Sequence, residues 1–567
     1  MKRFTHNPTP SALDGGFPLL ILFTLLLLPS LLFADIRLKD LEAMPKSYAK
    51  DFYIWRFFDQ NITPDEADQA FYQIKSVNWK LIRRYAKKTK MPGFAMAAKC
   101  YRLKPSALPA KDPACSAIAI TPYKFTKLSP AQRIALIKQL KDYPDLFHWM
   151  EVMSANHPFQ RLIQSNNATF FTIFNRCGRT WRAQYLNHPI PATRLKELSR
   201  DKAFAQSVKL IVTDPKLTHL QTSLLGIESK NLNHQATFFL AMNALKHNRP
   251  ALAQRYLHEA YKKAWLRFDK DKVLFWLAII DPKGNHLTEL SKSFDLNIYT
   301  LYAHEKLKTP WPRIATPKFQ KTQSDYNISD PFAWLKTLNE IHKKKNLALL
   351  EYSKRFAYKR TEGHYGVVMA RASFYKTHYF PIPYEEAYEG LSIDDKALML
   401  ALARQESLFI PASISPSYAL GMMQIMPFLV KALAKERHEP FDLDAMFIPE
   451  KNIAYARTHL KYLKRFLWHP LFIAYAYNGG IGFTKRLLTK WGSFQRGAYE
   501  PWLSMELVHY DESRRYGKKV LANYIVYKKI LGEPIDVASV VETLTEPRHT
   551  DRFRSRLLNA SKTAEEK

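Results

Sequence analysis

Residues 392–407 read SIDDKALMLALARQES, and this stretch decides how the C-terminal half of the chain is expected to fold. Ser392 is a favoured N-cap residue, and Asp394 and Asp395 then lie in a first helical turn, where the helix dipole favours negative charge. Residues 397–403 are all apolar. The stretch therefore predicts a helix that is buried inside a domain on most of its surface.

One acidic residue, Glu406, follows this apolar run in the last turn of the predicted helix. The helix dipole is negative at this end and apolar neighbours disfavour charge, so we expect a raised pKa for its carboxyl group. A carboxylic acid that keeps its proton near neutral pH is suited to general acid catalysis. Taken alone, a Glu at the end of a helix is more commonly an exposed surface residue, so its surroundings must decide.

Three short motifs follow Glu406-Ser407: Gly421-Met422-Met423-Gln424, Ala476-Tyr477-Asn478 and Glu512-Ser513-Arg514-Arg515-Tyr516. Together the four resemble the E-S, G-L-M-Q, A-Y-N and E-T-R-x-Y motifs of the soluble lytic transglycosylases, family-1 enzymes that cleave peptidoglycan with a lysozyme-like domain. Met422 stands where that family has Leu, and Ser513 where it has Thr. The resemblance is specific over residues 380–534, whereas over 35–379 it concerns architecture more than sequence.

The resemblance implies a lysozyme-like catalytic domain over residues 376–534 and a lyase activity. Such an enzyme cleaves the β-1,4 bond between N-acetylmuramic acid and N-acetylglucosamine without water. Glu406 is expected to protonate the glycosidic oxygen and then, as a base, to take the proton of the muramic acid 6-hydroxyl, which closes a 1,6-anhydro ring. No metal or cofactor is expected, and the 18 His show no metal-ligand spacing.

The predicted site has one catalytic residue, Glu406, and eight substrate-binding residues: Ser407, Met423, Gln424, Met426, Tyr477, Asn478, Glu512 and Tyr516. An amide such as that of Gln424 both donates and accepts hydrogen bonds, which suits sugar hydroxyl and N-acetyl groups. Structural roles stay open for several of these residues. Gln424 and Asn478 could stabilise turns, Tyr477 could be a core aromatic, and the methionines could pack in a core. Glu512 could pair with Arg514 or Arg515.

Three other functions compete with a lytic transglycosylase. A hydrolytic muramidase would use water, and its products would be heavier than the anhydro sugars by the mass of one water. A catalytically dead wall-binding scaffold is disfavoured by the intact Glu406 and the four motifs. A nucleic-acid-binding protein would explain the net charge of +34, but no nucleic-acid-binding module is found in the sequence.

Residues 35–375 predict a succession of helices that stack as a superhelix or solenoid, so the whole chain is expected to be predominantly all-α. Thr63-Pro64-Asp65-Glu66 forms a capping box. Residues 129–140 predict another helix, with Ile134, Ile137 and Leu140 on its apolar face. Residues 234–246 and 251–265 predict a helical hairpin around Pro250. Because no fixed repeat is found, an irregular all-α bundle remains the alternative.

Positive charge is concentrated in the N-terminal region. Residues 35–379 hold 57 Lys and Arg against 28 Asp and Glu, a net charge of +29, whereas residues 380–534 hold 20 against 16, or +4. A basic surface of this size suggests a polyanionic partner. Peptidoglycan glycan strands carry stem-peptide carboxylates and fit that description, although a generally basic, solvated surface would give the same composition.

The two ends of the chain predict targeting and tail segments. Residues 1–34 resemble a secretory signal peptide, with Lys2 and Arg3 before an apolar run over 17–33. An uncleaved membrane anchor is the alternative. We therefore expect a periplasmic protein of a Gram-negative envelope, in contact with the membrane only through this segment and with cell-wall synthesis proteins as further partners. Residues 535–567 are expected to form a C-terminal tail, mobile from 545 onward.

The chain has only three cysteines, so a disulfide-rich scaffold is excluded. Cys100 and Cys115 bracket a Pro-rich stretch, and in an exported protein these two could form a disulfide while Cys177 stays free. Three reduced thiols are equally compatible with the sequence.

Overall fold

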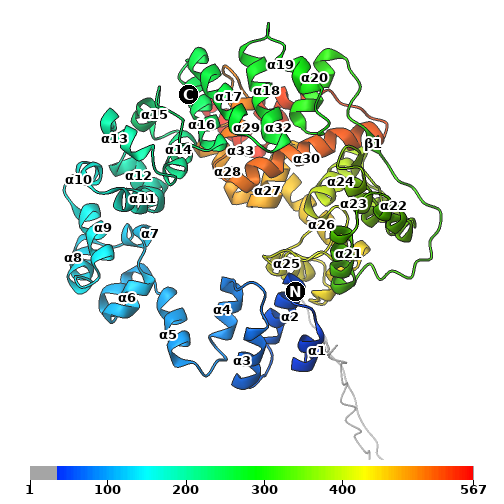
Figure 1. Ribbon diagram of the computed structural model, residues 1–567, viewed down its shortest axis with the longest axis horizontal. Helices are drawn as coiled ribbons and strands as arrows, with labels where there is room; N and C mark the ends of the chain where they lie inside the picture. Colours follow the sequence, from blue (N-terminus) through cyan, green and yellow to red (C-terminus); the bar gives the residue numbers. More distant parts are fainter. Residues whose placement is uncertain (1–34, 566–567) are drawn as a thin grey trace, which may run out of the picture.

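The computed structural model describes residues 35–565, and these residues are almost entirely helical, which confirms the predicted all-α class. Figure 1 shows the first helices following one another around an arc, and the later helices packing against its inner side and its two ends. The arc contains α1 (Leu38–Ala43), α2 (Tyr48–Phe57), α3 (Pro64–Tyr72), α4 (Trp79–Tyr85), α5 (Pro92–Tyr101), α6 (Pro113–Ala119), α7 (Pro122–Phe125), α8 (Pro130–Gln139), α9 (Pro144–Ser154), α10 (Pro158–Gln164), α11 (Asn167–Arg176), α12 (Arg179–Tyr185), α13 (Ala192–Leu198), α14 (Phe204–Val212), α15 (Thr218–Ser223), α16 (His234–Lys246), α17 (Pro250–Lys263), α18 (Arg267–Ile280), α19 (His286–Ser291) and α20 (Ile298–Leu307).

The rest of the described chain forms a connecting region, the predicted catalytic domain and a C-terminal extension. The connecting region contains β1 (Ile314–Ala315), α21 (Pro331–Lys343), α22 (Leu347–Ser353), α23 (Glu362–Ala372) and β2 (His378–Tyr379). The later helices are α24 (Ile393–Ser407), α25 (Pro427–Glu436), α26 (Pro449–Lys464), α27 (Pro470–Gly479), α28 (Ile481–Lys490), α29 (Trp502–Leu507), α30 (Asp511–Ile530), α31 (Val537–Glu542), α32 (Pro547–Thr550) and α33 (Arg552–Glu565). Short 3₁₀ helices are η1 (Pro105–Ala110), η2 (Lys354–Phe356), η3 (Glu385–Tyr388), η4 (Asp444–Phe447) and η5 (Thr543–Thr545). Strands β1 and β2 pair in parallel, with Ile314 opposite His378.

The local helix signals of the arc correspond to real helix ends. Thr63 and Glu66 form the expected capping box at the start of α3, and Pro64 takes the first helical position. Helices α16 and α17 pack against each other as the predicted hairpin. One residue of an expected apolar face was misplaced: Leu140 is buried and Ile137 packs against the core as predicted, but Ile134 in α8 is 67% exposed and Leu136 is buried instead. Ile134, Leu136 and Ile137 are too closely spaced for the sequence alone to show which of them is exposed.

The N-terminal end of the arc contacts the predicted catalytic domain. The guanidinium of Arg56 in α2 donates two hydrogen bonds, of 2.6 and 2.9 Å, to the carboxylate of Asp444. Asn78, the N-cap of α4, donates to the Tyr418 hydroxyl at 2.8 Å. Phe52 of α2 packs against the ring of Tyr418, with centroids 6.0 Å apart. Residues separated by more than 300 positions in sequence are thereby joined, and the arc becomes ring-like.

The other end of the arc meets the catalytic domain through a buried polar cluster. The carboxylate of Glu506 in α29 accepts hydrogen bonds from the Tyr299 hydroxyl of α20 and from Lys518 of α30. All three side chains are buried. A buried charge is tolerated when it is paired and hydrogen-bonded, as it is here, whereas removal of one partner would leave an uncompensated charge. This cluster therefore holds the catalytic domain in one position relative to α20.

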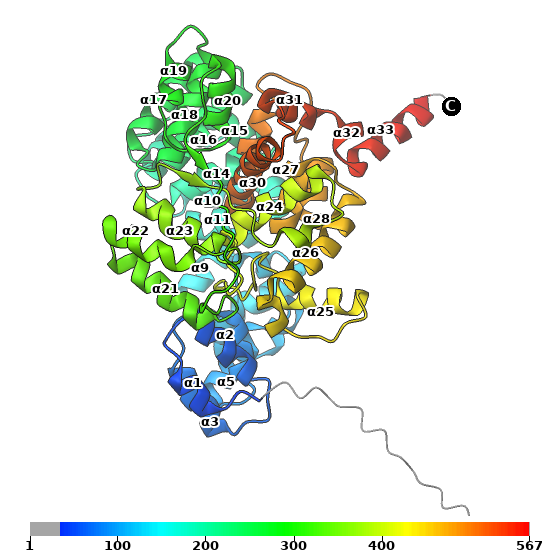
Figure 2. The same ribbon diagram turned by 90° about the vertical axis from the view of Figure 1, so that its right-hand side faces the viewer.

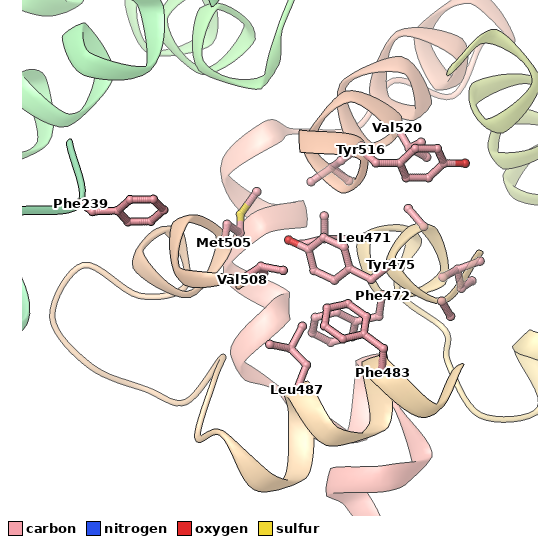
Figure 3. Close-up of a cluster of buried hydrophobic side chains, with 14 of the residues drawn as sticks. Phe239, Leu471, Phe472, Tyr475, Phe483, Leu487, Met505, Val508, Tyr516 and Val520 are labelled. Atoms are coloured by element: carbon pink, nitrogen blue, oxygen red, sulfur yellow. The ribbon is translucent and has the colours of Figure 1, made fainter. Parts of the chain in front are cut away.

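The core of the catalytic domain forms where α27, α28, α29 and α30 converge. Figure 3 shows side chains of these helices gathered in one cluster, with Phe239 of α16 at its edge. Tyr475 and Met505 are fully buried, and Tyr516 is 6% exposed. Tyr516 thus has its ring in the core, which fixes the position of its hydroxyl group.

The C-terminal residues differ from the sequence prediction. Residues 537–565 are largely helical rather than a mobile tail. Figure 2 shows α33 projecting from the molecule, and this helix also contacts α28. Arg554 explains this order: its guanidinium pairs with buried Asp551 at 2.7 Å and donates to the backbone oxygen of Phe494. The composition of this segment is polar, but its key charges are satisfied internally.

Cys100 and Cys115 form a disulfide that joins α5 to α6, and Cys177 is free and buried. The predicted signal segment, residues 1–34, lies outside the described residues. Between residues 35 and 565, no helix is both long and apolar enough to cross a bilayer.

Candidate active site

Glu406 lies at the C-terminal end of α24, where the sequence placed it. Ser392 caps this helix by accepting a hydrogen bond from the Asp395 amide, and the seven residues 397–403 are all buried. The helix ends at Leu408, which takes a left-handed conformation at φ 57°. This turn ends the helix one residue after the Glu406-Ser407 pair and leaves Glu406 half-buried.

The carboxyl group of Glu406 has a single protein hydrogen-bond partner among the described residues. The Tyr516 hydroxyl of α30 donates to Glu406 Oε1 at 2.6 Å. Burial raises the pKa of Glu406 to about 7, the Tyr516 bond opposes this rise, and the charge of Glu512 adds to it. Glu406 therefore retains its proton at a pH where an ordinary Glu is ionised.

A tight loop, residues 421–424, lies beside Glu406. Gly421 has φ +76°, and a Cβ at this position would clash with the carbonyl oxygen of Met446 and with Asn452. Only glycine combines this backbone conformation with so close an approach. The loop is tied to α24 because Ser407 Oγ donates to the Met422 carbonyl oxygen at 2.7 Å.

Two further side chains fix the centre of this loop. The Tyr477 hydroxyl of α27 donates to the Met423 carbonyl oxygen at 2.9 Å. Asn452 of α26 accepts from the Met423 amide at 2.6 Å and donates to the Leu420 carbonyl oxygen at 3.2 Å. Asn452 was not identified from the sequence, because it lies 29 residues beyond Met423 and outside every motif. Three helices, α24, α26 and α27, thus hold one loop against Glu406.

Three predicted site residues lie in this loop or directly after it, and their side chains have different environments. The side-chain amide of Gln424 donates to the carbonyl oxygens of Ser413 and Gly421, at 3.1 and 2.7 Å, so its donors stabilise the loop. Met423 is fully buried, which differs from the prediction that its side chain contacts substrate. Met426 is half-buried and is the N-cap residue of α25.

The remaining predicted residues form a hydrogen-bonded group across α27 and α30. Asn478 Nδ2 donates to Glu512 Oε1 at 2.9 Å, and Ser513 Oγ donates to Asn478 Oδ1 at 2.7 Å. Glu512 is exposed. It makes no ion pair with Arg514, which pairs with Asp511 instead. The structure therefore joins Glu406, Tyr516, Asn478 and Glu512 at one end of α30 and α27.

The chemistry of this arrangement is that of proton transfer. One half-buried carboxyl group with a raised pKa, Glu406, lies beside a rigid loop, an exposed second carboxylate and several amide and hydroxyl groups. Within residues 35–565, no group of three or more His, Cys, Asp or Glu is arranged to hold a metal ion.

Comparison with known proteins identifies a domain that contains most of this site. Residues 384–498 match the model of the family described as Transglycosylase SLT domain. A soluble lytic murein transglycosylase of Escherichia coli K12 is 31% identical over 170 residues, which cover 29% of this chain and 26% of that protein. A protein of the same name from Salmonella typhimurium is 32% identical over 161 residues, covering 27% and 24%. The chain thus spans about a quarter of the length of these curated relatives.

One solved structure extends the similarity beyond this segment at the level of the fold. The crystal structure of the 70 kDa soluble lytic transglycosylase from Escherichia coli aligns with a TM-score of 0.50 and 15% identity. The alignment covers 90% of this chain and 85% of that one, so the helical arc and the later domain share its overall arrangement.

Proposed function

We propose that this chain, whose residues 384–498 form a transglycosylase SLT domain, is a lytic transglycosylase that cleaves peptidoglycan without water. The observation that carries the proposal is the position of Glu406, half-buried, hydrogen-bonded to Tyr516 and with its pKa raised by burial to about 7. The relatives that match this segment are named soluble lytic murein transglycosylases. Their names support murein, or peptidoglycan, as the substrate.

Glu406 acts first as a general acid. Its Oε1 accepts the Tyr516 hydrogen, so the acidic proton is carried by Oε2, which has no hydrogen bond to the described residues and is available to substrate. Oε2 delivers this proton to the glycosidic oxygen between N-acetylmuramic acid and N-acetylglucosamine. The C–O bond breaks, and the bonding pair leaves with the protonated oxygen.

Glu406 then acts as a base. The ionised carboxylate takes the proton of the 6-hydroxyl on the same muramic acid, and that oxygen attacks the anomeric carbon to form the 1,6-anhydro ring. Because nucleophile and electrophile belong to one sugar, their effective concentration is high and no water needs to be positioned. Tyr516 stabilises the carboxylate between the two steps by its hydrogen bond.

Digestion of purified peptidoglycan followed by mass spectrometry tests this function. We expect 1,6-anhydromuropeptides, which are lighter than the reducing products by the mass of one water. Glu406→Gln should release none while retaining the fold. Reducing muropeptides alone would contradict the transglycosylase and establish a hydrolase.

A hydrolytic muramidase is the second candidate, because an exposed second carboxylate, Glu512, is close enough to act on the pKa of Glu406. Two carboxylates that flank the bond are the usual requirement of a glycoside hydrolase. The Asn478 bond to Glu512 instead favours a positioning role. Glu512→Gln should therefore reduce turnover less than Glu406→Gln, whereas equal losses would favour the two-carboxylate hydrolase.

The proposal includes a location and a partner for the basic arc. An enzyme of this activity works on the cell wall, so we place it in the periplasm, exported by the segment 1–34. Residues 35–379 carry a net charge of +29, and stem-peptide carboxylates of peptidoglycan are the anions that the arc would meet there.

A further inference from the structure

A row of aromatic rings leads from the candidate active site to the C-terminal helix. Tyr477, which holds the loop beside Glu406, packs against His459 of α26 with ring centroids 5.5 Å apart. His459 stacks on Tyr462 at 6.2 Å, and Tyr462 contacts Phe466 at 5.7 Å. Phe466 stacks on Phe553 of α33 at 5.6 Å, with ring planes only 9° apart. We call His459, Tyr462, Phe466 and Phe553 the aromatic row.

The aromatic row lies at the edge of the core, where Phe466 and Phe553 pack against it and the rings stay partly exposed. Positions 459, 462 and 466 are spaced by three and four residues, so they share one face of α26 and of its C-terminal end. Tyr462 is 38% exposed, and the other three rings are half-buried. Lys485 of α28 places its ammonium 5.6 Å from the centre of the Phe553 ring. Figure 2 shows α26, α28 and α33 on the same side of the molecule.

Polar contacts share the packing of α33 with the Phe466–Phe553 stack. Arg554 already fastens this helix through Asp551, the Phe494 carbonyl oxygen and the Thr550 hydroxyl, all at 2.7 Å. The Arg552 amide adds a bond to the Phe466 carbonyl oxygen at 2.9 Å. Among the described residues, Tyr462 is not one of those packed against the core and is 38% exposed, so the row keeps an open side that the packing of α33 does not cover.

We propose that the aromatic row binds the sugar rings of the glycan strand on one side of the bond that Glu406 cleaves. This inference rests on the proposed function. One face of a pyranose ring presents C–H groups and its edge presents hydroxyls, so an aromatic ring can cover the apolar face while the hydroxyls stay in water. The π-face of an aromatic ring is negative and attracts these C–H groups.

Continuity with the active site identifies the occupant as the same strand. The row begins at His459, which packs against Tyr477, and Tyr477 is one hydrogen bond from the loop beside Glu406. A strand whose scissile bond reaches Glu406 is therefore led along α26 toward Phe553. Burial lowers the pKa of His459, which keeps this ring neutral and flat against a neutral sugar.

Binding measurements in the Glu406→Gln background test the row without substrate turnover. The probes are purified long glycan strands and a tetrasaccharide of the same repeat. Tyr462→Ala combined with Phe553→Ala should raise the Kd for long strands by about tenfold, and more than the Kd for the tetrasaccharide. Tyr462→Phe should bind like the parent because the ring is kept. Trp265→Ala removes an equally large exposed aromatic, 79% exposed and outside the row, and should change nothing.

The outcomes separate this inference from the proposed function. If the double variant binds long strands as tightly as its parent, or if it loses affinity equally for both probes, the aromatic row has no role in extended binding. If the unmutated chain fails to cleave peptidoglycan, the proposed function is contradicted instead. Circular dichroism of the double variant checks that α33 stays folded.

Discussion

The helical arc and the catalytic domain are both built from α-helices, but they are held together over different distances along the chain. In the arc, helices pack mainly on their neighbours in sequence, as α16 does on α17 and α17 on α18. In the catalytic domain α24 packs on α30, and Asn523 bonds to Ala401 across 122 positions. A local defect in the arc should therefore stay local, whereas one in the catalytic domain should affect the active site.

The largest contrast between the two regions is expected for catalysis. Glu406→Gln keeps the size of the side chain but removes the proton that the reaction needs. General acid–base catalysis contributes roughly 10²–10⁴-fold, and here one residue performs both steps. We expect a loss of about 10⁴-fold or more in the release of anhydromuropeptides, which corresponds to about 5 kcal/mol of transition-state stabilisation.

The arc supplies the control for this loss. Binding of the Glu406→Gln chain to intact peptidoglycan should match that of the unmutated chain, because the arc and the loop 421–424 are unchanged. Near-normal release of anhydro products by this variant would mean that Glu406 is not the acid.

A second contrast compares two glycines with left-handed backbones. Gly421 of the active-site loop has φ +76° and no room for a Cβ, whereas Gly226 of the arc has φ +84° and nothing within 4 Å of that position. Gly226→Ala should cost about 1 kcal/mol of folding free energy from backbone strain alone. Gly421→Ala adds a clash with Met446 and should cost about 3 kcal/mol. Thermal unfolding compares the two variants, and equal shifts in Tm would show that the close contact at Gly421 is unimportant.

A third contrast concerns how each region holds the wall. The arc is basic and should bind through charge, which salt screens, while the aromatic row should bind through apolar contact. Raising the salt concentration should weaken binding of the Glu406→Gln chain to peptidoglycan by about tenfold. The ratio between the Kd of the Tyr462→Ala and Phe553→Ala double variant and the Kd of its parent should be the same at low and at high salt concentration. Salt-independent binding by the chain with an intact row would contradict the electrostatic role of the arc.

The same contrast explains what the sequence could and could not predict. Helix caps such as Thr63 and Ser392 are local signals, so helix starts in both regions were predictable. The position of Glu406 was predictable from one helix, residues 392–407, and from the four motifs. Asn452 was not predictable, because its role depends on a contact with Met423 that only the folded chain creates.

The C-terminal segment, residues 535–567, is a second case in which the sequence did not predict the structure. Its polar composition suggested a tail, yet the Arg554–Asp551 pair is buried and orders α33. Charge content alone does not reveal that two charges will satisfy each other inside a domain. Met423 differs from its prediction in the opposite direction. Its motif predicted a side chain that contacts substrate, but the side chain is fully buried in the folded chain.

The smallest expected effect is a shift in the pH dependence of kcat/KM. Burial raises the pKa of Glu406 to about 7, so activity should fall as the pH rises through 7 and the acid ionises. The Tyr516 hydroxyl donates to this carboxylate and stabilises its charged form. Tyr516→Phe removes that bond, so the pKa should rise and the alkaline limb should move upward by about one pH unit or less. A pH profile measured on soluble glycan strands checks the direction. A limb that moved to lower pH would mean that Tyr516 stabilises the protonated acid instead.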